Sequence, residues 1–180
     1  SLRLFLFLNA TSAVFSVTNP LYSVPQFPMP LFAIFAISSG LLLWHWKNRT
    51  RKVNISVVSS IFGSLWAWQI VSKFLLITHD QLTYLIMALL TVLFIGSLSF
   101  ASNIKAFILH SLPAFIACLW LSNHENWLRM TYSFALPVVA IGIHNILQRR
   151  NDHFAQELLS RLLEERETLT DLSMMDPLTG

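Results

Sequence analysis

Six long apolar runs, separated by short polar breaks, fill the chain up to about residue 147. They cover approximately residues 2–18, 30–46, 54–77, 81–101, 104–121 and 127–147. The hydrocarbon core of a bilayer requires roughly 20 apolar residues per helix, so these runs have the length of membrane spans. Backbone polar groups in hydrocarbon must be satisfied within their own segment, and a helix does this. The pattern therefore predicts an all-α membrane protein with a six-helix transmembrane bundle over residues 1–147.

The composition agrees with a membrane protein and divides the chain in two. Hydrophobic residues make up 54% of the 180 residues, charged residues 12%, and the mean hydropathy is +0.58. Residues 1–146 contain eight Lys or Arg and only two acids, whereas residues 147–180 contain four basic and seven acidic residues. For the first run, a secretory signal peptide is the competing interpretation. Polar residues at Asn9, Thr11 and Ser12 interrupt that run, and no small-residue cleavage pattern follows it.

The positions of Lys and Arg predict the orientation of the bundle. The segment HWKNRTRK after the second run carries Lys47, Arg49, Arg51 and Lys52. Positive charge collects on the cytoplasmic side of membrane proteins, so this loop is expected inside. Alternation of the spans then places Lys105 and the pair at 149–150 inside as well. The prediction is an N-in, C-in bundle with a cytoplasmic C-terminus.

The sequence becomes amphipathic after Arg150, with leucines at helical spacing and no Gly or Pro before Pro177. We therefore expect the sixth span to continue into the cytoplasm as one long helix. Its apolar stripe predicts a dimeric coiled coil. The a and d heptad positions, which form the contact between the two helices, are apolar except for one acidic residue at a d position. The seam residues are Ala155, Leu158, Leu162, Glu165, Leu169 and Leu172.

Two alternatives to this seam follow from the same residues. A neighbouring stripe, displaced by one residue, runs through Leu159, Leu163 and Arg166. The other alternative is a single amphipathic helix packed on its own protein. We favour the coiled coil, because a helix that leaves a bilayer has no neighbour of its own there and its leucines would face water. Two near-equivalent stripes could make the element bistable, so that a ligand shifts its population.

The segment SMMDPLTG at the end of the sequence resembles the opening of GGDEF domains, the catalytic domains of diguanylate cyclases. Their first motif reads Asp-x-Leu-Thr-Gly-Leu-x-Asn-Arg, and Asp176, Leu178, Thr179 and Gly180 match its first half. The stretch around Glu165, Arg166 and Thr168 is also similar to the signalling helices that precede such domains. The resemblance covers the final five residues and this linker.

This resemblance implies a parent enzyme that joins two GTP molecules into cyclic di-GMP, with Mg and GTP bound by a catalytic domain. The GGDEF signature itself is absent from these 180 residues, so no catalytic residue is assigned and no cofactor is expected in this region. The expected organisation is a membrane-associated sensor (MASE-like) over 1–147, a signalling helix over 148–175 and the start of a GGDEF domain over 176–180. The expected location is the bacterial inner membrane. The expected partners are a second copy, the bilayer and a small hydrophobic or amphiphilic ligand, with no nucleic acid.

Polar groups within the spans are the candidates for ligand contact, because an amide or ammonium group in hydrocarbon must find a partner. Trp66, Gln69 and Lys73 recur at helical spacing in the third run. Side chains three or four residues apart share a helix face. They could line a pocket for an acidic or carbonyl-bearing amphiphile. The alternative is that Gln69 bonds a neighbouring helix, the tryptophan packs, and Lys73 extends to the interface.

Two histidines raise a haem or metal hypothesis. His110 and His144 lie at the inner ends of the fifth and sixth runs, so antiparallel neighbours would bring them to a similar depth. Two neutral imidazoles could ligate haem iron or a transition metal. Histidines at an interface more often bond to water or backbone, and this is the simpler interpretation.

Two other receptor or transport functions compete with the cyclase hypothesis. The six-span layout is similar to that of histidine-kinase receptors that detect hydrophobic signals, but residues 151–180 lack a phosphoacceptor context around His153. A transporter typically has intramembrane acids or broken helices along a path. The only acids before residue 147 are Asp80 and Glu125, both in expected outer loops.

Overall fold

The fold is a helical bundle from which one long helix projects. The computed structural model describes residues 2–22 and 24–175, and this part of the chain contains no β-strand. Its elements are α1 (Leu2–Thr18), the short 3₁₀ helix η1 (Pro20–Tyr22), α2 (Met29–Lys47), α3 (Ile55–Phe74), α4 (Gln81–Ser99), α5 (Ile104–Leu121), the 3₁₀ helix η2 (His124–Asn126) and α6 (Trp127–Met174). The predicted all-α class and the long C-terminal helix are confirmed.

The helices have the length and apolar composition of membrane spans. Five of them, α2 to α6, are long and apolar enough to cross a bilayer. The remaining helix, α1, is also apolar but has only 17 residues. The chain is therefore consistent with a multi-pass membrane protein, and the pattern of apolar runs located all six helices.

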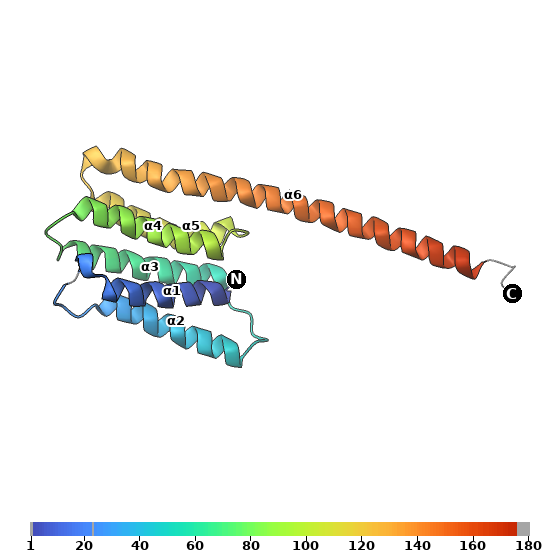
Figure 1. Cartoon of the computed structure of the whole chain (residues 1–180), viewed down its shortest axis with the longest axis horizontal. Coiled ribbons are helices and arrows are strands. Elements are labelled where there is room, and N and C mark those ends of the chain that lie inside the picture. The colour runs from blue at the N-terminus through green and yellow to red at the C-terminus, as the bar shows by residue number, and fades with distance from the viewer. Residues whose placement is uncertain (1, 23, 176–180) are drawn as a thin grey trace.

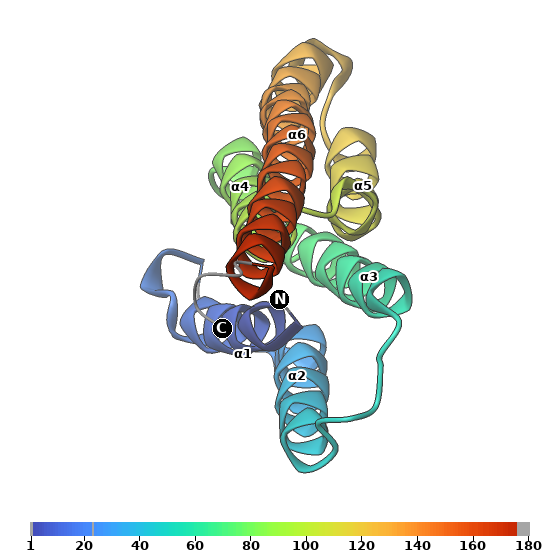
Figure 2. The ribbon, with the colours of Figure 1, turned by 90° about the vertical axis from the view of Figure 1, so that its right-hand side faces the viewer.

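The bundle is layered, with α6 at one edge and α2 at the other (Figure 2). Between them, α4 and α5 lie next to α6, and α1 and α3 lie next to α2. The most extensive contacts join α3 to α5 and α1 to α2. Consecutive helices run antiparallel, so the end of α1, the start of α2, the end of α3 and the start of α4 meet at one end of the bundle (Figure 1). This end is opposite to the one from which α6 projects.

Local chemistry sets several helix ends. The side chains of Asn54 and Asn103 accept hydrogen bonds from backbone N–H groups in the first turns of α3 and α5. These bonds satisfy donors that a helix start leaves unpaired. Pro30 lies in the first turn of α2, where a missing N–H costs no helical bond. The third apolar run was expected to reach residue 77, but α3 ends at Phe74 in a turn. Hydropathy indicates which residues favour an apolar medium, but it does not indicate at which residue the helical hydrogen bonds end.

A glycine allows α3 and α5 to approach closely. A Cβ atom added at Gly63 in α3 would lie 2.5 Å from the carbonyl oxygen of His110 in α5. Small residues at such positions let transmembrane helices pack backbone against backbone. Next to this contact, the ring of Phe5 packs edge-on against Phe62, with centroids 5.3 Å apart, and against His110 at 5.0 Å. This cluster joins α1 to α3 and α5 in the centre of the bundle.

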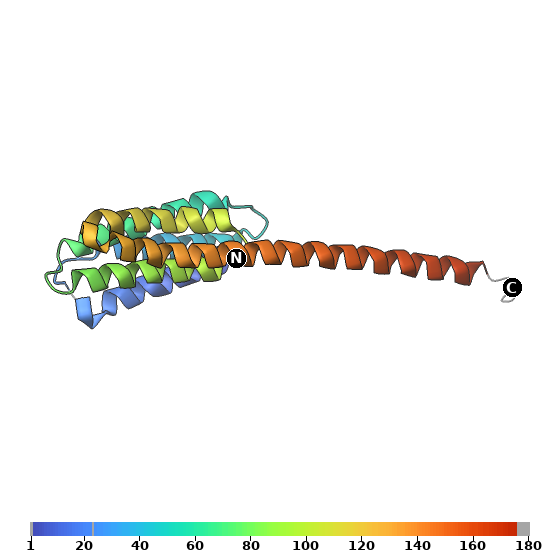
Figure 3. The same cartoon turned by 90° about the horizontal axis from the view of Figure 1, so that it is seen from above.

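Helix α6 leaves the bundle as one unbroken rod (Figures 1 and 3). It has 48 residues, and only Met130 and Asn145 are buried. Every residue from 149 to 175 is exposed, so this half of α6 does not pack on the rest of the chain. The alternative in which this amphipathic helix packs on its own protein is therefore not seen among the described residues.

Candidate ligand-binding site

A buried hydrogen bond fixes the inner boundary of the candidate site. The indole Nε1 of Trp66 in α3 donates to Oδ1 of Asn9 in α1 over 2.7 Å. The Asn9 amide nitrogen in turn donates to the carbonyl oxygen of Phe5, also at 2.7 Å. Asn9 is fully buried and Trp66 is 4% exposed. The polar groups of both side chains are thereby satisfied in an apolar interior, which holds the tryptophan ring in one orientation.

Gln69 and Lys73 follow Trp66 on the same face of α3, as the spacing predicts. Both are buried, with 5% and 9% of their surface exposed. The Lys73 Nζ lies over the ring of Tyr84 in α4, 5.9 Å from its centroid, which is cation–π range. No carboxylate of a described residue lies within ion-pair distance of Lys73. Among the described residues, Lys73 therefore has an aromatic face beside it and no acidic partner.

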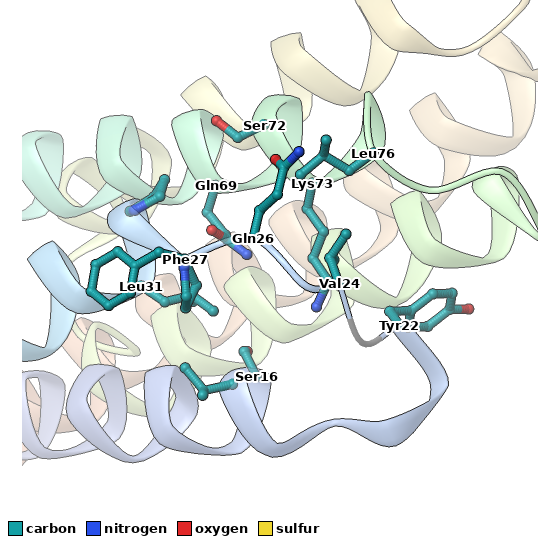
Figure 4. Close-up of a pocket in the computed structure, with 13 residues that line it drawn as sticks. Ser16, Tyr22, Val24, Gln26, Phe27, Leu31, Gln69, Ser72, Lys73 and Leu76 are labelled. Carbon is teal, nitrogen blue, oxygen red and sulfur yellow. The ribbon is translucent and has the colours of Figure 1, made fainter.

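Two adjoining cavities surround these α3 side chains. The larger has a volume of about 160 Å³ and opens toward the proline-containing loop before α2. The smaller, of about 90 Å³, lies toward α4 and is lined by Trp66, Gln69, Lys73 and Tyr84 among others. Ser16, Tyr22, Gln69 and Lys73 line both cavities. Figure 4 shows Gln69 and Lys73 reaching from α3 into the larger cavity, toward Ser16 of α1 and the segment around Val24 and Gln26.

The lining has a consistent chemical character. It presents hydrogen-bond donors from an ammonium, an amide and hydroxyl groups, and neither cavity is lined by Asp or Glu. The structure thus brings the three residues predicted as a pocket to the wall of one cavity. Whether they bind a ligand stays a prediction. Trp66 forms part of the apolar wall, as expected, and Trp68 points away from the site, with 47% of its surface exposed.

Sequence reasoning missed the partners that other helices contribute to this site. Asn9 had an available signal, because an amide in the middle of an apolar run needs a partner. Tyr22, Tyr84 and Ser16 had none, since residues of these types also occur at membrane interfaces and helix ends. Their role depends on which helices are neighbours, and the apolar pattern of single helices does not determine this.

The two candidate haem or metal ligands lie in different surroundings. His110 is fully buried among Phe5, Phe100 and the glycines of α3 and α4. His144 is on an exposed position of α6. Within residues 2–22 and 24–175, no group of three or more His, Cys, Asp or Glu side chains could hold a metal ion. The haem or metal hypothesis stays a prediction, and its two residues do not line the cavities described above.

The predicted dimer seam lies on the projecting half of α6. Its leucines are all exposed in the single chain, from 48% for Leu158 to 68% for Leu169. The neighbouring stripe is exposed to a similar degree, with Leu159 at 57% and Leu163 at 52%. The single ion pair among the described residues, between Arg161 and Glu157 at 3.0 Å, is also on this part of α6. The predicted GGDEF entry residues, Asp176 to Gly180, lie outside the described residues.

Comparison of the chain with protein-family models, with curated proteins and with solved structures gave no match.

Proposed function

We propose that this chain is a membrane sensory and dimerisation module that controls a C-terminal diguanylate cyclase. In this proposal α1 also spans the membrane, which gives six spans. The start of α1 and the projecting half of α6 would then both lie on the cytoplasmic side. The protein would reside in the bacterial inner membrane. Occupancy of the cavity around Gln69 and Lys73 would change the position of α6, and α6 would transmit that change to two catalytic domains.

The observation that supports this proposal most strongly is the continuity of α6. A helix of 48 residues is about 72 Å long at 1.5 Å per residue, well over twice what is needed to cross hydrocarbon. It ends one residue before the Asp-Pro-Leu-Thr-Gly segment that resembles a GGDEF entry motif. Pro137 lies inside α6 without ending it. A displacement of the transmembrane half can therefore be carried along α6 as far as Met174.

The distribution of charge supports the proposed orientation. The last residue of α2, Lys47, and the loop that follows it, with Arg49, Arg51 and Lys52, lie at the end of the bundle from which α6 projects. Under the positive-inside rule this end faces the cytoplasm, where GTP is available. The cavity end would then face outward, which suits a receptor for an extracellular or membrane-borne signal.

The exposed leucines of α6 support the proposed dimer. A free helix with a stripe of leucines in water is unfavourable, and burying each of them against a twin would stabilise it by roughly 1.5–3 kcal/mol. Cyclic di-GMP synthesis joins two GTP molecules between two catalytic domains, as the GGDEF resemblance implies, so a paired output helix suits this chemistry. Glu165 at one d position keeps the pairing marginal, which a regulated element requires.

The proposal is tested in the full-length parent protein by changing the phase of α6. Insertion of four residues after Gln156 rotates the downstream helix by about 40° beyond one full turn, while seven residues restore the heptad phase. We expect the four-residue insertion to change cyclic di-GMP synthesis severalfold and the seven-residue insertion to keep it near the parental rate. A parent that makes no cyclic di-GMP from GTP, or that instead transfers phosphate from ATP to a histidine, contradicts the proposal.

A further inference from the structure

An open apolar groove adjoins the larger cavity described above. It lies between α1 and α2, has a volume of about 520 Å³ and is almost entirely apolar. Its walls include Ala13, Val14 and Val17 of α1 and Leu31, Phe32 and Phe35 of α2. Val17, Phe27, Pro28 and Leu31 line both the groove and the larger cavity, so the two spaces adjoin. The cavity that contains the polar groups of Gln69 and Lys73 thus adjoins an apolar groove.

The charge at the polar end is not balanced by the protein. Only two acids precede residue 147, Asp80 and Glu125, and both are exposed in loops. An ionised side chain in a membrane helix usually pairs with another or marks a functional site. Lys73 is 9% exposed and lies at the wall of the cavity, and no carboxylate of a described residue is within ion-pair distance of it. An anion from outside the chain is the partner that this arrangement lacks.

We infer that this composite site binds a single-chain amphiphile with a carboxylate head, such as a long-chain fatty acid. The carboxylate would lie against the Lys73 ammonium and accept a hydrogen bond from the Gln69 amide. The acyl chain would lie in the groove between α1 and α2, where the side chains of Val14 and Phe32 are exposed. A role of this ligand as a signal rests on the proposed function. Its binding to the protein can be measured independently of that function.

Two features favour a head group on one chain over a two-chain phospholipid. The lining itself provides one cation, Lys73, and hydrogen-bond donors from side-chain amides and several hydroxyl groups, which suits a head with one negative charge. The cavity around Gln69 and Lys73, of about 160 Å³, is small and is bounded by Tyr22 and the loop from Val24 to Pro28. The apolar groove between α1 and α2 that adjoins it has room for one acyl chain. A phosphodiester with two chains would leave its second chain without a groove of this kind.

The test measures equilibrium binding of radiolabelled palmitate to the protein in nanodiscs of zwitterionic phosphatidylcholine. We expect saturable binding that unlabelled palmitate displaces. Methyl palmitate, which has the same chain without the charge, should compete roughly 30-fold less well, the effect of removing one partner of a buried charge pair. Nanodiscs enriched in phosphatidylglycerol should retain palmitate binding. Equal competition by the methyl ester, or loss of binding in phosphatidylglycerol, would overturn the inference.

Variants separate binding from folding. Lys73→Met should weaken palmitate binding by about 30-fold, whereas Lys73→Arg should keep most of it. Lys105→Met removes the same charge from an exposed site at the other end of the bundle and should leave binding unchanged. Because Lys73 lacks an acidic partner, Lys73→Met should also leave the thermal stability of the empty protein unchanged or higher. Unaltered palmitate binding by Lys73→Met overturns the inference.

The two proposals fail in different ways. Palmitate could bind as expected and leave cyclic di-GMP synthesis by the full-length parent unchanged. This result would contradict the sensory role and would still support the binding site. Absence of saturable palmitate binding, combined with the expected response to the α6 insertions, contradicts the ligand inference and keeps the proposed output.

Discussion

Trp66 of α3 and Asn9 of α1 form a buried hydrogen bond of 2.7 Å between their side chains, one helical turn from Gln69. The two residues are 57 positions apart in the chain. The amide nitrogen of Asn9 donates a hydrogen bond to the carbonyl oxygen of Phe5, and its amide oxygen accepts one from the indole of Trp66. The bond therefore joins α1, whose outer half lines the apolar groove, to the helix that carries the buried lysine.

Removal of this bond should loosen the wall of the site. We expect Asn9→Leu to lower the free energy of unfolding by about 0.5–2 kcal/mol, because a hydrogen bond between transmembrane helices is lost and a buried N–H is left unpaired. Thermal unfolding in detergent, followed by tryptophan fluorescence, measures the change. Thr11→Val is the matched control, since the exposed Thr11 hydroxyl bonds only to Phe7 of its own helix. Equal stability of the Asn9→Leu and parental proteins would contradict this role.

The glycine contact between α3 and α5 should tolerate no side chain. Gly63→Ala places a methyl group 2.5 Å from the His110 carbonyl oxygen, so the two backbones must separate. We expect a loss of about 1–3 kcal/mol, as is usual for overpacking. Gly40→Ala is the matched control in α2, because its added Cβ meets no atom within 4 Å and alanine is the better helix former. Both unfolding midpoints are measured in the same detergent, and equal midpoints would show that the close approach is absent.

The seam assignment on α6 predicts different effects for two glutamates that are both exposed in the single chain. Glu165→Leu fills the misfit d position and should tighten the dimer by about tenfold or more. Glu167→Leu changes an f position, which faces away from the seam, and should have little effect. Energy transfer between donor- and acceptor-labelled copies in liposomes, measured against dilution in lipid, gives the dissociation constants. A similar tightening by both variants would indicate non-specific hydrophobic association.

The proposed orientation predicts which loops a membrane-impermeant maleimide can reach. In a Cys118→Ala background, which removes the buried native thiol, His79→Cys should be labelled in intact spheroplasts. Arg51→Cys should be labelled only after lysis. Both positions are exposed, so a difference between them reports the membrane and not burial. The reverse pattern of labelling would place the α6 rod outside the cytoplasm and would exclude control of a GTP-dependent enzyme.

The sequence predicted helix positions well because the physics of hydrocarbon leaves few choices. Each apolar run had to satisfy its own backbone, so α4 begins at Gln81 and α5 spans Ile104–Leu121, as the pattern indicated. The shared face of Trp66, Gln69 and Lys73 followed from helical spacing alone. Rotation of each helix did not follow, because these spans are apolar on all sides and no polar face indicates which side packs inward.

The two histidines illustrate that limit. The similar depth expected for His110 and His144 stays a prediction, and the direction of each side chain could not be predicted from the sequence. His110 packs between aromatic rings in the core, while His144 is exposed on α6. In the same way, Tyr84 could be assigned to α4 from the sequence, whereas its position beneath Lys73 depends on how α3 and α4 are oriented.

The most direct test of the account is the distance between the two α6 rods in a membrane. Spin labels at Ser160→Cys, in the Cys118→Ala background, report this distance by pulsed electron resonance in nanodiscs. The account predicts one narrow distance distribution, consistent with helix axes about 10 Å apart, that shifts when palmitate is added. A monomer with no dipolar coupling, and with mobile labels typical of an unfolded segment, would contradict it.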